Sequence, residues 1–290
     1  MRILGTTKVC AVIGDPIEHS FSPQIHNAAF QHLKLDYTYV AFRVSEKNLE
    51  NALIGIRALG IHGLNVTMPL KTKIIPHLDE LDPDAEAIGA VNTILNTKGK
   101  LIGYNTDGLG AFSALKANNC YLKNKKILIL GAGGASRAIS YTLAKDAHEI
   151  VILNRTIERA RKLAHDLHKI FGEKIRQRKL DEEALEKELN DTDILINATP
   201  LGMHPCENQT PVNRKFLRSD LTIFDLVYNP PETKLLREAK AIGAKTVNGV
   251  AMLVHQGAFS FEILTGKRAP IDVMLKACAE VIEDQTKSDK

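Results

Sequence analysis

The sequence has few cysteines, no long hydrophobic run and no amino-terminal segment of the kind that directs secretion. Its four cysteines, Cys10, Cys120, Cys206 and Cys278, show no C-x-x-C spacing and no neighbouring histidine cluster. We therefore expect reduced, packed thiols. No apolar stretch approaches 18 residues, and no basic segment precedes a hydrophobic one at the start. These absences favour a soluble cytoplasmic protein.

A large excess of one charge sign is also missing. Lysine and arginine number 38 against 34 aspartates and glutamates, so the formal net charge is +4, too small to indicate nucleic-acid binding. The modest excess suits a site for anionic small molecules, and equally the solvated lysines of an ordinary surface. His165 and His168 lie three positions apart on a charged helix, but no carboxylate or cysteine framework accompanies them, so we expect no metal site.

Strands and helices alternate along the 290 residues, which predicts an α/β fold, and the length favours two domains. In the first part we expect strands at 8–13, 37–44, 61–67, 90–95 and 101–104, and helices at 24–33, 46–59, 72–78 and 109–118. The last two strands form a hairpin, and the rest of the sheet is expected to be mostly parallel. Ser22 and Ser45 precede two of these helices, as capping residues do.

The second part has the layout of a doubly wound nucleotide-binding domain, with about six strands between 126 and 249. Two further helices, at 250–264 and 271–285, are followed by no strand and are expected to pack on the first domain or clamp a hinge. The expected domains are therefore 1–107 with 250–290, and 108–249.

A glycine-rich turn follows the apolar strand at 126–130. Gly131 gives the turn an unhindered backbone, Gly133 permits close approach of a pyrophosphate, and the N–H groups of the next helix face the phosphate charge. Ser136 takes the place of the third glycine of G-x-G-x-x-G and is still small. The turn predicts a dinucleotide site whose binding residues are Gly131, Ala132, Gly133, Gly134 and Ala135, although such turns are often only tight turns.

The strand at 149–153 ends in Asn154, Arg155 and Thr156, where NAD-specific folds usually place an acid against the ribose 2′-hydroxyl. The acid is missing here. Arg155, with Arg159 one helical turn later, suits a 2′-phosphate instead, so the sequence favours NADP over NAD. The alternative is that Asn154 and Thr156 only cap the next helix and that the arginines are solvated.

Polar residues gather at the strand ends of the first domain. Asn65 and Thr67 alternate with apolar residues and leave the same face of a strand. Lys71 is expected to begin a helix, where the macrodipole disfavours a lysine. Asn92 lies on the next strand, and Asp107 stands at a helix boundary, where capping is a common role.

The ordered motifs resemble those of the shikimate dehydrogenases. They are Ser20-Phe-Ser-Pro23, Asn65-Val-Thr-Met-Pro-Leu-Lys71, Gly89-Ala-Val-Asn-Thr93, Asn105-Thr-Asp107, Gly131-Ala-Gly-Gly-Ala135, Asn154-Arg-Thr156, Asn197-Ala-Thr-Pro-Leu-Gly-Met203 and Gly249–Gln256. The resemblance covers nearly the whole chain. It implies NADP-linked interconversion of 3-dehydroshikimate and shikimate in aromatic amino-acid biosynthesis, with a substrate-binding domain, an NADP-binding Rossmann domain and an active site in the cleft between them.

The resemblance also implies roles for individual residues. Lys71 would be the catalytic acid and base, and Asp107 its partner and a substrate anchor. The substrate carboxylate would be held by Ser20, Ser22 and Tyr228, and its hydroxyls by Asn65, Thr67, Asn92, Asp107 and Gln256. The nicotinamide would be lined by Thr199, Leu226, Gly249 and Met252, although Leu226 and Met252 also suit a hydrophobic core and Gly249 a turn.

Two departures and three alternatives accompany this interpretation. Leu264 stands where relatives often carry tryptophan, which the chain lacks, and this should affect packing more than chemistry. Ser22, where quinate-using relatives commonly carry threonine, favours shikimate. The alternatives are a quinate/shikimate dehydrogenase with relaxed cofactor choice, a catalytically silent dinucleotide sensor, and a tetrahydrofolate dehydrogenase, which the hydroxyl- and amide-rich residues disfavour. We expect a monomer or homodimer whose domains close over the substrate at a hinge near Asp107 and Gly249.

Overall fold

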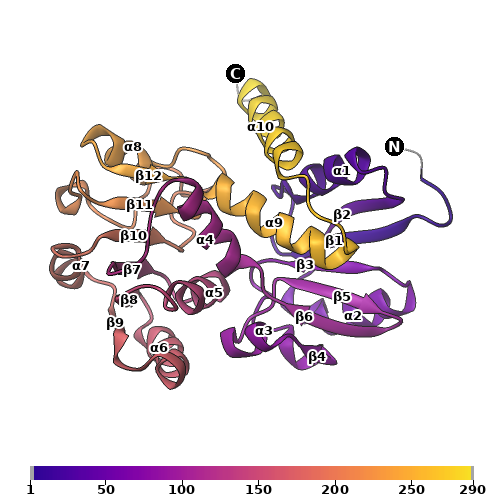
Figure 1. Ribbon diagram of the computed structural model, residues 1–290, viewed down its shortest axis with the longest axis horizontal. Coiled ribbons are helices and arrows are strands. Elements are labelled where there is room, and N and C mark those ends of the chain that lie inside the picture. Colours follow the sequence, from indigo (N-terminus) through magenta and orange to yellow (C-terminus); the bar gives the residue numbers. More distant parts are fainter. Residues whose placement is uncertain (1–2, 289–290) are drawn as a thin grey trace. The chain divides into compact units, whose positions relative to one another are not determined.

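The computed structural model describes residues 3–288, with side chains to residue 285. The chain divides into two compact units (Figure 1). Unit 1 comprises Met1–Asp107 and Val254–Lys290, and unit 2 comprises Gly108–Leu253. The divisions therefore fall within two helices, α4 (Asp107–Ala117) and α9 (Gly249–Thr265).

Unit 1 is built on a six-stranded sheet in the order β2-β1-β3-β5-β6-β4. Its strands are β1 (Lys8–Gly14), β2 (Tyr37–Arg43), β3 (Gly63–Val66), β4 (Glu80–Leu81), β5 (Thr93–Thr97) and β6 (Lys100–Tyr104). β1 pairs in parallel with β2 and β3. β5 is antiparallel to β6, as the expected hairpin requires, and also to β3. β4 pairs in parallel with β6, so the sheet is mixed, with its antiparallel pairs on either side of β5.

The helices of unit 1 are α1 (Ser22–His32), α2 (Leu49–Ala58), α3 (Pro83–Ile88), the carboxyl-terminal part of α9, and α10 (Ile271–Ser288). The region from α9 onward belongs to the same unit as the first sheet, and α10 packs against α1. Buried apolar residues of β1, β3 and α2, among them Ile13, Leu64 and Leu53, form the core on one face of the sheet.

Three local predictions for unit 1 are wrong. The helix expected at 72–78 is absent: this segment forms turns and one short 3-10 helix at Ile75–His77. Pro76 explains the difference, because proline inside an α-helix removes a hydrogen bond and clashes with the preceding turn. Lys71 consequently lies in a turn. Ser22 is the first helical residue of α1 and makes no side-chain cap, and Ser45 precedes a 3-10 helix without capping it.

Unit 2 contains six strands that all pair in parallel, in the order β12-β11-β10-β7-β8-β9. They are β7 (Lys126–Leu130), β8 (Glu149–Asn154), β9 (Ile175–Lys179), β10 (Ile194–Asn197), β11 (Thr222–Asp225) and β12 (Lys245–Val247). Helices α5 (Gly134–Leu143), α6 (Ile157–Phe171), α7 (Glu182–Leu189) and α8 (Lys234–Ala241) connect them. Read in chain order, this is the strand order 6-5-4-1-2-3 of the Rossmann fold, so the expected fold class is confirmed.

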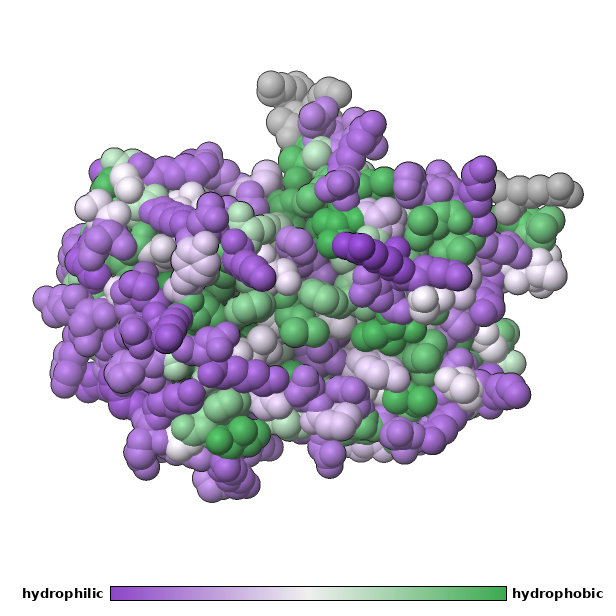
Figure 2. Space-filling model, in the orientation of Figure 1, coloured by the Kyte–Doolittle hydropathy of each residue, from purple (hydrophilic) through white to green (hydrophobic). Residues whose placement is uncertain are grey.

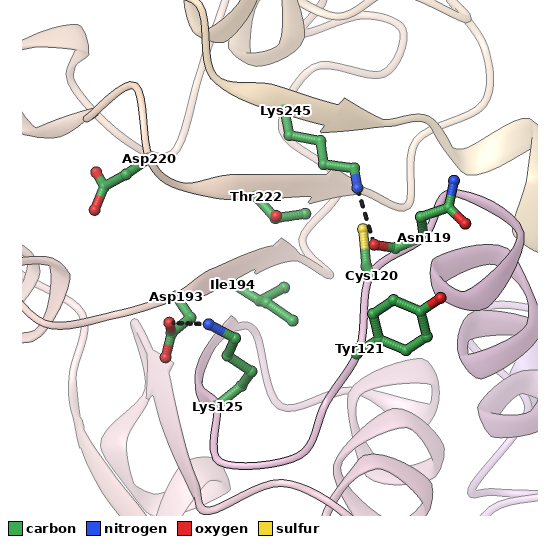
Figure 3. A pocket seen from close by; sticks show the side chains of 9 residues that line it. All are labelled: Asn119, Cys120, Tyr121, Lys125, Asp193, Ile194, Asp220, Thr222 and Lys245. Atoms are coloured by element: carbon green, nitrogen blue, oxygen red, sulfur yellow. Dashed lines mark hydrogen bonds and ion pairs between the residues drawn. The ribbon is translucent and has the colours of Figure 1, made fainter.

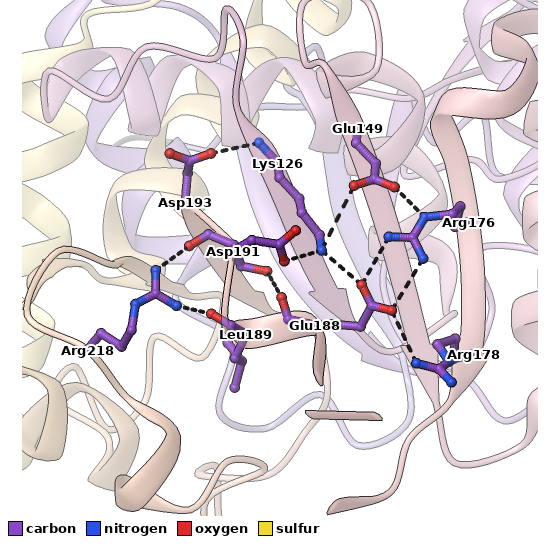
Figure 4. Close-up of polar contacts among 10 residues, drawn as sticks. Lys126, Glu149, Arg176, Arg178, Glu188, Leu189, Asp191, Asp193 and Arg218 are labelled. Carbon is purple, nitrogen blue, oxygen red and sulfur yellow. Dashed lines mark hydrogen bonds and ion pairs between the residues drawn. The ribbon is translucent and has the colours of Figure 1, made fainter. Parts of the chain in front are cut away.

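An ion-pair cluster lies at the amino ends of the unit 2 strands (Figure 4). Lys126, the first residue of β7, contacts Glu188 at 2.9 Å and Asp191 at 2.5 Å. Glu188 on α7 is also paired with Arg176 of β9 at 3.1 Å and with Arg178 at 3.4 Å. These ion pairs hold α7 against the amino-terminal edge of the sheet. The opposite, carboxyl-terminal edge carries the loops that follow the strands.

A cavity also lies at the amino-terminal edge (Figure 3). The first residues of β10, β11 and β12, Ile194, Thr222 and Lys245, line it, and Lys245 donates a hydrogen bond to the Asn119 carbonyl oxygen at 3.1 Å. The glycine-rich turn follows β7 at the other end of the sheet, so this cavity is separate from the predicted dinucleotide site. On the face drawn in Figure 2, hydrophilic side chains cover most of the outer helices of unit 2.

Candidate active site

Lys71 and Asp107 form a buried ion pair in unit 1. The Lys71 ammonium lies 2.5 Å from Oδ2 of Asp107, and the two side chains are 16% and 3% exposed. The backbone N–H of Val91 donates to the Lys71 carbonyl oxygen at 2.8 Å, which fixes the turn that carries the lysine. Asp107 begins α4, and its own backbone N–H donates to Oδ1 of Asn105 at 3.0 Å. The carboxylate therefore holds the lysine and does not cap the helix through its side chain.

Asn92 holds the second oxygen of this carboxylate. Its Nδ2 lies 2.9 Å from Oδ1 of Asp107, 2.9 Å from the Thr106 hydroxyl and 3.2 Å from Oε1 of Gln256. The backbone N–H of Thr106 donates to Asn92 Oδ1 at 2.9 Å, which fixes the orientation of the amide. Hydrogen bonds thus bring together four predicted residues from separate segments: Lys71 from the turn after β3, Asn92 from the position before β5, Asp107 from the start of α4, and Gln256 from α9.

Asn65 lies in a buried network that joins this cluster, because its Nδ2 also donates to the Asn92 carbonyl oxygen at 3.1 Å. Its Oδ1 accepts from the Tyr39 hydroxyl at 2.6 Å, and its Nδ2 lies within hydrogen-bond distance of the Thr93 and Ser260 hydroxyls, at 3.1 and 2.8 Å. His26 stacks on Tyr39 with ring centroids 4.3 Å apart. The amide of Asn65 is therefore engaged by other side chains of unit 1, and any contact with a substrate would be added to these bonds.

Ser20 and Thr67 lie in loops that follow the neighbouring parallel strands β1 and β3, and Ser22 begins α1 directly after the first of these loops. The Ser22 backbone N–H donates to the Ser20 hydroxyl at 3.3 Å in the loop after β1. Thr67 follows β3, and its N–H donates to the Ile13 carbonyl oxygen at 2.9 Å. Open α/β sheets bind ligands at the carboxyl ends of such strands. The structure thus places all three hydroxyls at the edge where a ligand is expected.

The glycine-rich turn in unit 2 has the geometry that a pyrophosphate site needs. Gly131 has φ +110°, and a side chain there would meet the Ala198 carbonyl oxygen at 2.9 Å. Gly133 precedes α5 with no side-chain cap, and an added methyl group would meet no atom within 4 Å. Ser136 is fully buried, as expected for the small residue that packs helix against strand. The first N–H groups of α5 are therefore open to an anion.

Arg155 and Arg159 are exposed at the start of α6, next to Asn154 and Thr156. Within the part of the chain that the structure describes, neither guanidinium makes a hydrogen bond or ion pair, so both are available to a phosphate. Thr156 is the residue before α6 but makes no side-chain cap, and Asn154 Nδ2 donates to the Thr156 carbonyl oxygen at 2.7 Å. The capping alternative is therefore wrong for Thr156.

The four residues expected around the nicotinamide differ in their surroundings. Thr199 follows β10, and both its N–H and its hydroxyl donate to Oδ1 of Asn197, at 3.0 and 2.7 Å. A side chain on Gly249 would collide with the Leu226 carbonyl oxygen, so these two segments approach closely. Met252 is 7% exposed and, with Leu226, packs on the core of unit 2. Tyr228 follows in the loop after β11 and is half-buried.

Several polar residues of these clusters were not predicted. Thr106 and Asn105 lie inside the Asn-Thr-Asp motif, so their position next to Asp107 could have indicated a part in the site. Nothing in the local sequence of Tyr39, Ser260 or Asp225 indicates their contacts, because their partners lie far away in the sequence. Among the described residues, no group of three histidine, cysteine or acidic side chains is arranged to hold a metal ion. No helix in that part of the chain combines the length and the apolar character of a membrane span.

A Rossmann unit with an open glycine-rich turn, together with a unit that carries a buried lysine–aspartate pair, defines a dinucleotide-dependent oxidoreductase. Three family models match the chain in order: the shikimate dehydrogenase substrate binding domain at residues 12–94, shikimate / quinate 5-dehydrogenase at 113–237, and the shikimate 5'-dehydrogenase C-terminal domain at 249–278. The chain belongs to the shikimate dehydrogenase family.

Individual relatives agree with this membership. The shikimate dehydrogenase (NADP+) of Methanopyrus kandleri is 50% identical over 94% of this chain and 96% of its own length. A crystal structure of a shikimate dehydrogenase in complex with NADP+ is 49% identical, covers 97% of this chain and 98% of that chain, and superposes with a TM-score of 0.90. The shikimate 5-dehydrogenase of Listeria monocytogenes, in complex with shikimate and NAD, is 42% identical, covers 95% of this chain and 98% of its own, and has a TM-score of 0.86.

Proposed function

We propose that the chain is an NADP-dependent shikimate dehydrogenase that reversibly reduces 3-dehydroshikimate to shikimate on the route to chorismate and the aromatic amino acids. One observation carries the proposal: the 2.5 Å ion pair between Lys71 and Asp107, whose second oxygen is held by Asn92. A silent dinucleotide sensor would have no need to retain a buried, fully oriented proton donor.

The residues of unit 2 fit NADP. The open N–H groups before and within the first turn of α5 suit the pyrophosphate, and the unpaired Arg155 and Arg159 suit the 2′-phosphate of the adenosine ribose. Thr199, Leu226, Gly249 and Met252 are proposed to line the nicotinamide. When bound, NADPH supplies the hydride that reduces the carbonyl carbon.

Lys71 supplies the proton in this scheme. Its ammonium donates a proton to the substrate oxygen as that oxygen gains negative charge, and the C=O bond becomes CH–OH. Asp107 stabilises the ammonium before the reaction and, because its Oδ1 is fixed by Asn92, aims it at one position. In the oxidative direction Lys71 accepts the proton of the substrate hydroxyl, and Asp107 stabilises the charge that the lysine regains.

The substrate carries one carboxylate and several hydroxyls, which require small polar partners. Hydroxyls of Ser20, Ser22 and Tyr228 are proposed to bind the carboxylate. Asn65, Thr67, Asn92, Asp107 and Gln256 are proposed to bind the hydroxyls. Ser22, where quinate-using relatives commonly carry threonine, supports shikimate over quinate as the preferred substrate.

A comparison of four oxidation rates tests the function. Shikimate and quinate are each supplied with NADP and with NAD, and reduced nicotinamide is followed by its absorbance. The proposal predicts the highest kcat/KM for shikimate with NADP. Comparable rates in all four would establish the quinate/shikimate alternative with relaxed cofactor choice, for which the NAD complex of the Listeria relative is a precedent. Binding of NADP without any turnover would establish the sensor.

Arg155→Ala should raise the KM for NADP about tenfold and leave the KM for NAD nearly unchanged, because it removes a charged hydrogen bond to the 2′-phosphate alone. Steady-state kinetics with both cofactors measures the effect. Arg161→Ala is the matched control. Arg161 is an exposed arginine on α6, the helix that follows Arg155, and pairs with Glu158. An equal loss with NADP and NAD would refute the assignment of Arg155.

The domain roles, assembly and location also belong to this proposal. We assign substrate binding to 1–107 with 250–290 and NADP binding to 108–249, and expect the domains to close when substrate binds. Small-angle scattering with and without shikimate and NADP should show a smaller radius of gyration in their presence; an unchanged radius would refute closure.

Four free cysteines, three of them buried, suit the reducing cytoplasm, and the chain is expected there as a monomer or homodimer.

A further inference from the structure

Asp225 is a buried carboxylate at the end of β11, in the middle of a hydrogen-bonded chain in unit 2. The residue is 0% exposed, and within the described residues no lysine, arginine or histidine pairs with it. Its Oδ2 accepts from the Thr233 hydroxyl at 2.6 Å, and its Oδ1 accepts from Asn197 Nδ2 at 2.9 Å and from the Val227 N–H at 3.1 Å. The buried Asp107 and Glu188, in contrast, each contact a cation.

The carboxylate helps to fix which way the Asn197 amide points, together with the Leu201 carbonyl oxygen, which accepts from the same Nδ2 at 3.2 Å. An ionised carboxylate only accepts hydrogen bonds, so Asn197 must direct its NH2 group toward Asp225 and its carbonyl oxygen away. That oxygen accepts from both the N–H and the hydroxyl of Thr199. The hydrogen of the Thr199 hydroxyl is therefore used inside the protein, and the hydroxyl can only accept from a ligand.

The same carboxylate fixes the backbone after β11. The Val227 N–H donates to it, and the Leu226 N–H donates to the Asn197 carbonyl oxygen at 3.0 Å, so the peptides before and after Leu226 are both held. Gly249 lies directly against the second of them, the Leu226–Val227 peptide. Burial raises the pKa of Asp225 to about 6, and hydrogen bonds from Thr233, Val227 and Asn197 oppose the rise. The group is thus mostly ionised, and acceptor-only, at neutral pH.

We propose that Asp225 is a positioning residue for the nicotinamide half of the cofactor: through Asn197 it makes Thr199 an acceptor for the carboxamide N–H, and through Val227 it sets the Leu226 peptide. This inference rests on the proposed function, since it takes Thr199, Leu226 and Gly249 as nicotinamide neighbours. Binding of the adenosine half is expected not to depend on Asp225. Arg155 and Arg159, which are proposed to bind its 2′-phosphate, follow β8 and not β11.

Two ligands allow the binding of the nicotinamide half and of the adenosine half of the cofactor to be measured separately. NADPH contains the nicotinamide, whereas adenosine 2′,5′-bisphosphate contains only the adenosine half with its 2′-phosphate. Asp225→Asn removes the negative charge and one of the two acceptor oxygens that Asn197, Val227 and Thr233 share, and so weakens the set of hydrogen bonds that orients Asn197. The variant should bind NADPH about tenfold more weakly and adenosine 2′,5′-bisphosphate with unchanged affinity. Fluorescence titration of NADPH and calorimetry of the bisphosphate measure the two dissociation constants without turnover.

Three variants control the experiment. Asp220→Asn changes an exposed aspartate just before β11 that pairs with Arg218, and should leave both affinities unchanged. Thr233→Ser keeps the hydroxyl that bonds to Asp225 and should also bind both ligands normally, whereas Thr233→Val should reproduce the selective loss. If Asp225→Asn does not fold, the Thr233 pair carries the same comparison.

The outcomes are distinguishable. Selective weakening of NADPH supports the positioning role. Equal weakening of both ligands, or of neither, overturns it, because Asp225 would then be a general structural residue or without effect. If the wild-type protein binds neither ligand, the proposed function fails first, and the inference fails with it.

Discussion

Replacing Lys71 by alanine should lower kcat by about a hundredfold to ten-thousandfold, the usual contribution of a positioned acid or base. The ammonium is the donor proposed for the substrate oxygen, and the paired Asp107 cannot replace it, since an ionised carboxylate has no proton to give. Steady-state rates with saturating shikimate and NADP give kcat. Because the variant leaves the buried Asp107 carboxylate without its cation, some loss of stability is expected, and kcat is compared only after circular dichroism shows that the variant is folded.

Lys73→Ala is the matched control for this variant. Lys73 lies two residues away in the same turn region, is 60% exposed and faces Glu46 at 3.7 Å. Its removal should leave kcat unchanged. A Lys71→Ala protein that folds and retains kcat within a few-fold of the wild type would contradict the role of Lys71 as the acid and base.

Replacing Glu188 by alanine should lower the free energy of unfolding by about 3–5 kcal/mol, because it leaves buried positive charge without its partner. Glu188 is 2% exposed at the side chain and contacts Lys126, Arg176 and Arg178. Lys126 is itself 9% exposed at the side chain and would keep only Asp191, which is 70% exposed, and the more distant Glu149. Urea unfolding at neutral pH measures the difference.

The difference in the free energy of unfolding between the wild type and Glu188→Ala should become smaller in acid. Protonation of Glu188 then removes the same ion pairs from the wild type. Burial raises the pKa of Glu188, but Lys126 and Arg176 outweigh it and hold the pKa below its ordinary value of 4.5. A lowered pKa in the folded state stabilises the protein above that value, and this stabilisation disappears as the pH falls through the folded-state pKa. Glu182→Ala, which breaks an exposed pair with Lys215 at the start of the same helix, should change stability by about 1 kcal/mol or less. Equal losses from both glutamates would refute the special role of the buried cluster.

The parallel sheet of unit 2 could be predicted because its signals are local. β7, β8 and β10 contain apolar runs of three or four residues, and β7, β8, β9 and β11 are each followed by an α-helix, so the alternation of a parallel sheet can be recognised in the sequence. The glycine-rich turn is equally recognisable from local sequence, although the close approach that requires glycine at position 131 is to the distant Ala198 carbonyl oxygen.

The structure around Lys71 could not be predicted in the same way. Its segment contains residues that suit a helix, but Pro76 limits the helical part to one 3-10 turn, and the lysine is held in place by Val91 and Asp107, which are 20 and 36 positions away. The roles of Thr106 and Asp225 depend in the same way on partners that the sequence does not place next to them. The family resemblance therefore indicated which side chains are proposed to carry the chemistry, and long-range contacts decide how each is oriented.

Mixing the wild-type protein with NADPH and 3-dehydroshikimate tests the proposed reaction most directly. The absorbance of NADPH should fall by one equivalent for each equivalent of 3-dehydroshikimate consumed, with shikimate as the product identified by mass and retention time. Unchanged absorbance under conditions in which NADPH is shown to bind would contradict the assignment of this chain as a shikimate dehydrogenase.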